Sequence, residues 1–169
     1  MEKKLNIIRL CPVYYPYIKH GGSVVADYEL DKSLCAEGHS VTVLSCKENK
    51  NKNKKKINLN KVKIFYFSCI GSILHGISIG ALFELIKLAI YKRKNIDIVW
   101  FGGTWNLFTI IGPIICRIFS LKYIITPHGM LIPKLIKKKS KFLKLFAVKF
   151  FLKKNLSKAF KVHFTAKKE

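Results

Sequence analysis

The chain has 169 residues, half of them hydrophobic, and its 32 Lys and Arg against 9 Asp and Glu give a formal net charge of +23. This length suits a single domain with a core of its own. No stretch approaches the ~20 uncharged apolar residues of a membrane-spanning helix, and the short apolar run behind Met1 has no small-residue cleavage site after it. We therefore expect a cytoplasmic protein.

The positive charge is concentrated toward the C-terminal part of the chain, where no acidic residue occurs from Ile98 to Lys168. Such a field attracts polyanions, which include nucleic acid, an anionic membrane surface and phosphorylated substrates. Charge alone does not distinguish among these partners.

The five cysteines are widely spaced and form no Cys-x-x-Cys pair: Cys11, Cys35, Cys46, Cys69 and Cys116. This pattern indicates neither a disulfide framework nor a zinc site. Because four of them lie in predicted strands or helices among apolar neighbours, we expect them to act as small hydrophobic side chains.

The chain begins with a strand and a helix. We predict the strand over Leu5–Cys11 and the helix over Ser23–Glu37. Helical spacing places Val25, Leu30 and Leu34 on the inward face, and the glycine that follows the helix supplies its C-terminal stop.

Two further strands flank a segment of very different composition. The strands are predicted over Val41–Cys46 and Val62–Phe67, which are apolar and β-branched or aromatic. Between them, Lys47–Lys61 is nearly all Lys and Asn, which cannot bury itself. We predict a solvated loop there.

The second half of the chain continues the alternation. We predict a helix over Leu82–Arg93, a strand over Ile96–Phe101, a mostly buried helix over Leu107–Leu121 that Pro113 kinks, and a strand over Tyr123–Thr126.

The last segment combines charge with amphipathic spacing. Ser140–Phe160 is predicted as a basic amphipathic helix and Val162–Thr165 as a final strand. The lysines of Lys134–Lys161 suit either a solvated helix face or the head groups of an anionic membrane. Short strands alternating with helices predict an α/β fold in one domain, a Rossmann-like doubly wound parallel sheet. Right-handed crossovers then bring every strand-to-helix loop to one sheet edge, where a ligand would bind.

The first loop at this edge runs from Cys11 to Ser23 and contains Gly21 and Gly22. Paired glycines allow close approach of a ligand to the N-terminus of the next helix, which suits a phosphate or carboxylate. A tight turn without a ligand explains the same residues. The loop matches neither the dinucleotide fingerprint nor the P-loop.

Two later loops reach the same edge. Phe101–Trp105 contains Gly103 and Trp105, an indole that either stacks on a sugar or packs in the fold. Thr126–Met130 holds His128 between Pro127 and Gly129, which places an imidazole for hydrogen bonding or proton transfer at the end of a strand.

Taken in order, these segments resemble the N-terminal half of family 4 glycosyltransferases, which have the GT-B fold. The resemblance is carried by the Gly21-Gly22 loop, Gly38-His39-Ser40-Val41-Thr42-Val43 ("GHxVxV"), Ile96-Asp97-Ile98-Val99-Trp100 ("PDIVH"), Thr126-Pro127-His128-Gly129-Met130 ("PHGM") and His163-Phe164-Thr165 ("HFTS"). It spans nearly the whole chain.

The resemblance implies a retaining, metal-independent transfer of a sugar from a nucleotide-sugar to a polysaccharide or lipid-linked glycan. His128 would contact the transferred sugar, and Gly21 and Gly22 would line the donor diphosphate. The weaker cleft residues are Gly103, Trp105 and Gly129. The nucleotide-sugar is a co-substrate, and no other cofactor and no metal is implied.

Members of this family carry a second domain with a Glu-x7-Glu segment that holds the donor, and we expect residues 1–169 to lack this second domain. Glu84 and Asp97 stand alone and offer no substitute. We therefore expect residues 1–169 to be inactive on their own, as a fragment, a truncated product or one half of a split enzyme whose C-terminal domain is a separate chain.

Two alternatives stay open. The first is a non-catalytic basic binding module for an anionic membrane surface or nucleic acid. Nucleic acid is the weaker choice, because the sequence has no recognition-helix signature, zinc ligands or RNP-type strands. The second is a truncated remnant, which would expose an apolar cleft face.

Overall fold

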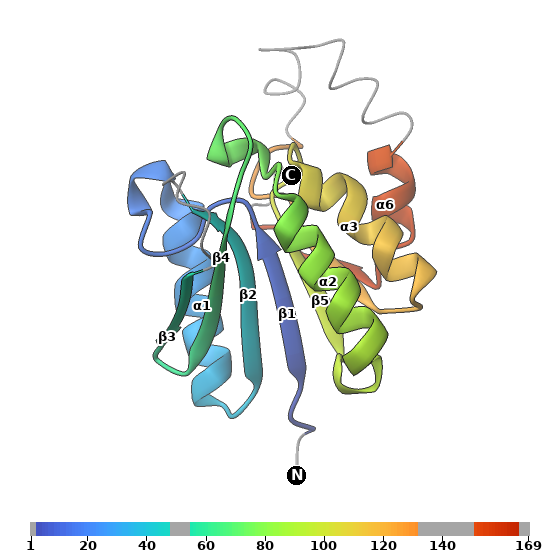
Figure 1. Ribbon diagram of the computed structural model, residues 1–169, viewed down its shortest axis with the longest axis horizontal. Coiled ribbons are helices and arrows are strands. Elements are labelled where there is room, and N and C mark those ends of the chain that lie inside the picture. Colours follow the sequence, from blue (N-terminus) through green and yellow to red (C-terminus); the bar gives the residue numbers. More distant parts are fainter. Residues whose placement is uncertain (1–2, 48–54, 132–150, 166–169) are drawn as a thin grey trace.

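A computed structural model describes residues 3–47, 55–131 and 151–165, and these form an α/β fold around one sheet (Figure 1). The strands are β1 Asn6–Cys11, β2 Ser40–Lys47, β3 Lys55–Leu59, β4 Val62–Ser68, β5 Ile98–Gly102, β6 Tyr123–Thr126 and β7 Lys161–Val162. They are ordered β3-β4-β2-β1-β5-β6-β7. Among these strands β3 alone runs antiparallel to its neighbour, so the predicted Rossmann-like parallel sheet is confirmed.

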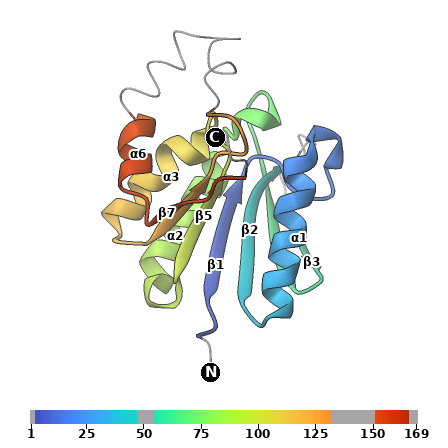
Figure 2. The ribbon, with the colours of Figure 1, turned by 180° about the vertical axis from the view of Figure 1, so that it is seen from behind.

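Helices cover both faces of the sheet (Figures 1 and 2). They are α1 Gly22–Ala36, α2 Ile79–Lys92, α3 Leu107–Ile118 and α6 Lys153–Ser157, with 3-10 turns η1 Ile18–His20, η2 Ile73–His75 and η3 Arg93–Asn95. α1 lies on one face, and α2 and α3 pack side by side on the other. Alternation along β1 divides the core accordingly, because Ile8 and Leu10 join the α2/α3 side and Ile7 and Cys11 join the α1 side.

The edge strand β3 corrects the prediction of a loop over Lys47–Lys61. Lys55–Leu59 pairs with β4 through a two-residue turn in which Asn60 and Lys61 have φ of 47° and 68°. Positive φ at both turn residues is the geometry that two-residue hairpins favour. Ile57 and Leu59 pack against the α1-side core, so alternating apolar residues decide the local structure despite the surrounding lysines. Residues 48–54 lie outside the described residues.

The buried face of α1 differs from the predicted one. Val25 is 44% exposed, and Leu30 and Leu34 are half-buried. The residues that face the sheet are Val24, Asp27, Tyr28, Asp31 and Cys35. Two carboxylates are therefore buried under this helix, and the buried Arg9 of β1 is the reason.

The helix α3 continues through Pro113, whose nitrogen cannot donate to the carbonyl of Thr109 one turn earlier. The side-chain amide of Asn155 in α6 donates to this carbonyl at 2.9 Å and to that of Ile110 at 3.0 Å. Its Oδ1 accepts from Arg117 at 2.8 Å. Asn155 thus replaces the missing helical hydrogen bond and attaches α6 to α3.

The C-terminal predictions are only partly covered by the structure. In the predicted helix Ser140–Phe160, residues 140–150 lie outside the described residues, and α6 ends at Ser157, before Phe160. The last strand, predicted over Val162–Thr165, is confined to Lys161–Val162. Other boundaries shift by a few residues: α2 begins at Ile79 because the hydroxyl of Ser78 caps it, and α3 ends at Ile118.

Within the described residues, one helical segment, Ile73–Asn95, is long and apolar enough to cross a membrane by length and composition, and its most apolar window of 18 residues has a mean hydropathy of 1.8. This corrects the prediction that no stretch approaches such a helix. A third of the segment's apolar window is buried in the fold, and Ala81, Leu85 and Ala89 pack against the sheet.

The cysteines behave as predicted from their neighbours. Cys11, Cys35, Cys46 and Cys116 are buried, and Cys69 is half-buried. Burial raises the pKa of the Cys116 thiol to about 12, so this side chain is a neutral part of the core at physiological pH.

Candidate functional site

A cavity of about 300 Å³ opens at the carboxyl ends of β1 and β5, where the three predicted loops meet. Its walls come from the first loop and α1, from the η2 segment, and from the loops after β5 and β6. The residues that line it include Ser23, Asp27, His75, Gly103, Trp105 and His128. The cavity lies where parallel α/β sheets commonly bind ligands.

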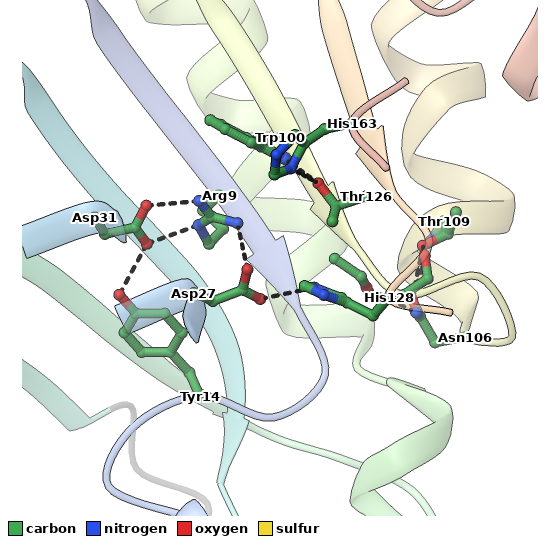
Figure 3. Close-up of polar contacts among 12 residues, drawn as sticks. Arg9, Tyr14, Asp27, Asp31, Trp100, Asn106, Thr109, Thr126, His128 and His163 are labelled. Atoms are coloured by element: carbon green, nitrogen blue, oxygen red, sulfur yellow. Dashed lines mark hydrogen bonds and ion pairs between the residues drawn. The ribbon is translucent and has the colours of Figure 1, made fainter. Parts of the chain in front are cut away.

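His128 stands on the loop after β6 in a left-handed backbone conformation, with φ of 55°. Such a conformation is uncommon for a residue other than glycine and is often stored strain at a functional position. Its side chain is 10% exposed, and Nε2 lies 3.2 Å from Oδ2 of Asp27 (Figure 3). The ring therefore lines the cavity while its Nε2 is in contact with Asp27.

Asp27 belongs to a buried ionic cluster beneath the cavity (Figure 3). Arg9, which is fully buried, donates from Nη1 to Oδ1 of Asp27 at 3.1 Å. It also donates from Nη2 to Asp31 at 2.7 Å, and its Nε lies 2.6 Å from the other oxygen of Asp31. The Tyr14 hydroxyl donates to Asp31 at 2.8 Å, and the guanidinium lies over the Trp100 ring at 4.5 Å.

The pKa values of the two carboxylates are shifted in opposite directions. Burial favours the neutral form of both, but Arg9 and His128 outweigh it at Asp27 and hold its pKa below the usual value. At Asp31 burial prevails over the hydrogen bonds from Arg9 and Tyr14 and raises the pKa. Asp27 is therefore ionised at neutral pH beside the cavity.

Glycines make room for the pair formed by Asp27 and His128. A Cβ on Gly102 would lie 3.2 Å from Oδ2 of Asp27 and 3.7 Å from Nε2 of His128. Gly103 has φ of +79°, and a Cβ there would lie 3.0 Å from Nδ2 of Asn106. A side chain at either position would crowd the cavity wall.

Polar contacts fix the loop after β5. Asn106 caps α3 by accepting from the Thr109 N–H at 3.1 Å, and its amide donates to the Gly102 carbonyl at 3.0 Å. The indole N–H of Trp105 donates to the carbonyl of Met130 at 3.1 Å and so joins the second loop to the third. The Trp105 indole thus packs between loops and also forms part of the cavity wall.

The last predicted strand contributes a contact next to this site. Nδ1 of His163 lies 3.2 Å from the hydroxyl of Thr126, which accepts from the indole N–H of Trp100 at 2.7 Å. Because Trp100 also covers Arg9, this chain of contacts connects β7 with the buried cluster.

The structure brings together some of the sequence-predicted residues and not others. His128, Gly103 and Trp105 line the cavity. Gly21 and Gly22 are exposed, and no atom lies within 4 Å of a Cβ built on either; their neighbours His20 and Ser23 line the cavity instead. Gly129 lies between two lining residues without lining the cavity itself.

Asp97 lies away from the cavity, because it precedes β5 and so stands at the amino end of the sheet. Its carboxylate accepts from the Asn6 N–H at 2.9 Å and pairs with Lys3 at 2.6 Å. These hydrogen bonds lower the pKa of Asp97 and assign it a structural role.

Sequence reasoning missed Asp27, which is the carboxylate of the site. A signal was present: Asp27 and Asp31 are spaced i, i+4 on one helix, and Arg9 interrupts the apolar strand Asn6–Cys11. A buried Arg requires such partners. It also missed His75 and Asn106, which reach the cavity from η2 and the start of α3.

Among the described residues, no group of three His, Cys, Asp or Glu side chains is placed to hold a metal ion. The side chains that line the cavity can form hydrogen bonds, and the imidazole of His128 can also take part in proton transfer.

No model of a known protein family matches the chain, and no curated protein matches it. Any functional conclusion therefore rests on the Rossmann-like fold and the cavity at its carboxyl edge.

Proposed function

We propose that the chain is the N-terminal, acceptor-side domain of a retaining glycosyltransferase, which transfers a sugar from a nucleotide-sugar to a polysaccharide or lipid-linked glycan. The observation that carries the proposal is the meeting of the three motif loops at one cavity, with His128 and Trp105 in its wall. A polar imidazole beside an aromatic ring suits a hydroxylated, uncharged ligand such as a sugar.

In this proposal the donor diphosphate binds beside the cavity, at Gly21 and Gly22, whose neighbours His20 and Ser23 line it. The first helical turn there carries Ser23 into the cavity wall, and the N-terminus of the 15-residue α1 offers free N–H groups and a positive dipole end. Because no side chain fills the space beside either glycine, a phosphate can approach the backbone. In this proposal Gly103, Trp105 and Gly129 border the sugar and acceptor.

The test is transfer of labelled sugar when the chain is co-expressed with a candidate donor-binding domain, a second α/β domain with a Glu-x7-Glu segment encoded in the same genome. A panel of nucleotide-sugars is offered with membrane and polysaccharide acceptors. His128→Ala is expected to reduce transfer by about 100-fold or more, as loss of a group that acts in proton transfer or charge stabilisation does.

The matched control is His39→Ala, because His39 lies at the opposite end of α1, where its Nδ1 accepts from the Leu5 N–H. Transfer that survives in His128→Ala as well as in His39→Ala would contradict the proposal, as would an absence of transfer from every donor.

A specific observation also favours a peripheral location on an anionic membrane. Ile79, Phe83 and Ile90 are spaced along one stripe of α2 and are 69%, 67% and 56% exposed. This stripe lies opposite the face that packs on the sheet, so α2 is apolar on both sides. Exposed apolar surface of this kind marks an interaction site.

The charge of the chain indicates which partner covers the stripe of Ile79, Phe83 and Ile90. Lys87 and the basic end of α2 and η3, Lys92–Lys94, are exposed beside it. A second copy would bring +23 against +23, which opposes self-association, whereas anionic lipid head groups attract each Lys or Arg by roughly 1 kcal/mol. In the segment Lys134–Lys161, the described lysines Lys153, Lys154, Lys158 and Lys161 are exposed as well.

Vesicle sedimentation tests this location. We expect binding to phosphatidylglycerol-containing vesicles, weak binding to pure phosphatidylcholine vesicles, and a reduction on anionic vesicles in Phe83→Ser/Ile90→Ser. Val25→Ser is the matched control, since Val25 is exposed on α1 across the sheet. If the double variant binds anionic vesicles as well as the wild-type protein does, α2 is not the membrane contact. Binding to DNA in place of vesicles would support the nucleic-acid alternative.

A further inference from the structure

The pair formed by Asp27 and His128 joins elements that lie far apart in the sequence. Asp27 is on α1 and His128 on the loop after β6, 101 positions later, and both side chains are largely buried at the cavity wall. Helix packing alone does not require a carboxylate here, because the neighbouring buried positions Val24 and Tyr28 of the same helix are filled by apolar or aromatic groups.

Two contacts fix the carboxylate of Asp27 itself. Its Oδ1 accepts from Nη1 of Arg9 at 3.1 Å, and Arg9 is anchored in turn by Asp31. Its Oδ2 is then directed at His128 (Figure 3). Asp31 forms hydrogen bonds with Arg9 and Tyr14 and none with His128. Both aspartates therefore contact Arg9, but only Asp27 contacts the imidazole of His128.

The donor in the contact follows from the charge state. An ionised carboxylate can only accept a hydrogen bond, and Asp27 is ionised because Arg9 and His128 outweigh its burial. The proton between the two groups therefore sits on Nε2 of His128, whether the ring is neutral or an imidazolium. In the neutral ring Nδ1 is then the acceptor.

The backbone reinforces this arrangement. His128 is held at φ of 55°, a conformation that persists only when surrounding contacts over-determine it. Gly102 leaves the space in which the two side chains meet, since a Cβ there would approach Oδ2 of Asp27 within 3.2 Å.

We infer that Asp27 is a positioning residue for His128: with Arg9 behind it, its carboxylate keeps the proton on Nε2 and holds the ring at the cavity wall. The catalytic meaning of this role rests on the proposed transferase function, in which His128 contacts the transferred sugar. The geometric role itself is independent of that function.

The test is nitrogen-15 NMR of the histidine rings in the chain of 169 residues, with the His128 signals assigned by their loss in His128→Ala. We expect Nε2 of His128 to carry a proton in the wild-type protein. In Asp27→Asn, this proton should no longer be confined to Nε2, so the shifts of the two nitrogens move toward a mixture of tautomers. Asp31→Asn is the matched control and should leave the His128 shifts in place.

A neutral wild-type ring with its proton on Nδ1 would overturn the inference, and so would equal changes in Asp27→Asn and Asp31→Asn. If Asp27→Asn does not fold, Gly102→Ala displaces the same pair without removing a charge and is expected to shift the same two nitrogens. Failure of the proposed function appears separately, as a His128 ring with the expected protonation that no nucleotide-sugar or glycan perturbs.

Discussion

At the scale of single residues, Arg9 decides how the α1 side of the core is built. It is fully buried in β1, and an unpaired guanidinium in that position would be costly. The cost is met by Asp27 and Asp31, one turn apart on α1, and by the hydrogen bond from Tyr14 to Asp31. These residues explain why the helix turns two carboxylates to the sheet and leaves Val25 in solvent.

Replacement of Arg9 by Met is expected to lower the free energy of unfolding by about 3–5 kcal/mol, because two buried carboxylates lose their cation. Urea denaturation measures this change. Lys63→Met is the control, since Lys63 is exposed on β4 and surface changes usually stay within about 0.5 kcal/mol. A loss below about 1 kcal/mol in Arg9→Met would show that the cluster is not structurally coupled as described.

The pH dependence of stability separates the two aspartates. The pKa of Asp27 is lowered in the fold, so its contribution is present above the unfolded value of about 4 and is lost as pH falls through the lowered folded pKa. The pKa of Asp31 is raised, so its contribution is present below the unfolded value and is lost as pH rises through the raised one.

We therefore expect that Asp27→Asn makes the fall in stability below pH ~4 shallower. Asp31→Asn should remove a fall that occurs above this pH. Chemical denaturation at a series of pH values measures both. Identical profiles for the two variants would contradict the assignment of opposite shifts.

The residues of the candidate site were only partly predictable from sequence. His128, Gly103 and Trp105 follow strands directly, so topology alone brings them to one edge. Asp27 was missed because its role depends on partners 18 and 101 positions away, which no local pattern contains.

At the scale of elements, α3 and α6 depend on each other. Pro113 leaves the Thr109 carbonyl without its helical donor, and the amide of Asn155 supplies one from α6. Asn155 is fully buried, so its removal would leave two carbonyls without these hydrogen bonds.

A double-mutant cycle tests this coupling. Asn155→Ala alone is expected to lower the free energy of unfolding by about 2–3 kcal/mol, and by less when Pro113→Ala restores an N–H to the helix. The interaction energy between the two sites should be on the order of 1 kcal/mol. Urea denaturation measures the three variants. If the losses in the free energy of unfolding add strictly, the Asn155 amide does not replace the backbone N–H that Pro113 lacks.

The order of the elements could be predicted from alternating apolar strands and helical spacing, and the parallel sheet followed from that order. The edge strand β3 could not be foreseen, because its Lys-rich composition resembles that of a loop and its pairing with β4 is a tertiary contact. Helix ends differed where a cap decides them, as with Ser78 at the start of α2.

At the scale of the whole molecule, the fold separates the two proposed binding surfaces in space. The cavity lies at the carboxyl edge of the sheet, whereas the exposed apolar stripe of Ile79, Phe83 and Ile90 lies on the outer side of α2. The proposed ligand site and the proposed membrane contact therefore use different surfaces, and the variants described above can alter one without touching the other. The high positive charge of the chain favours anionic partners in general.

The most direct measurement of the central claim, that the cavity binds a nucleotide-sugar, is a backbone and side-chain amide NMR titration with a panel of nucleoside diphosphate sugars. We predict saturable shifts at Gly22, Ser23, His128 and the indole N–H of Trp105, whereas inorganic pyrophosphate added alone should shift only the first two. Shifts confined to surface lysines, produced equally by pyrophosphate and by DNA, or no shifts with any member of the panel, would contradict the claim.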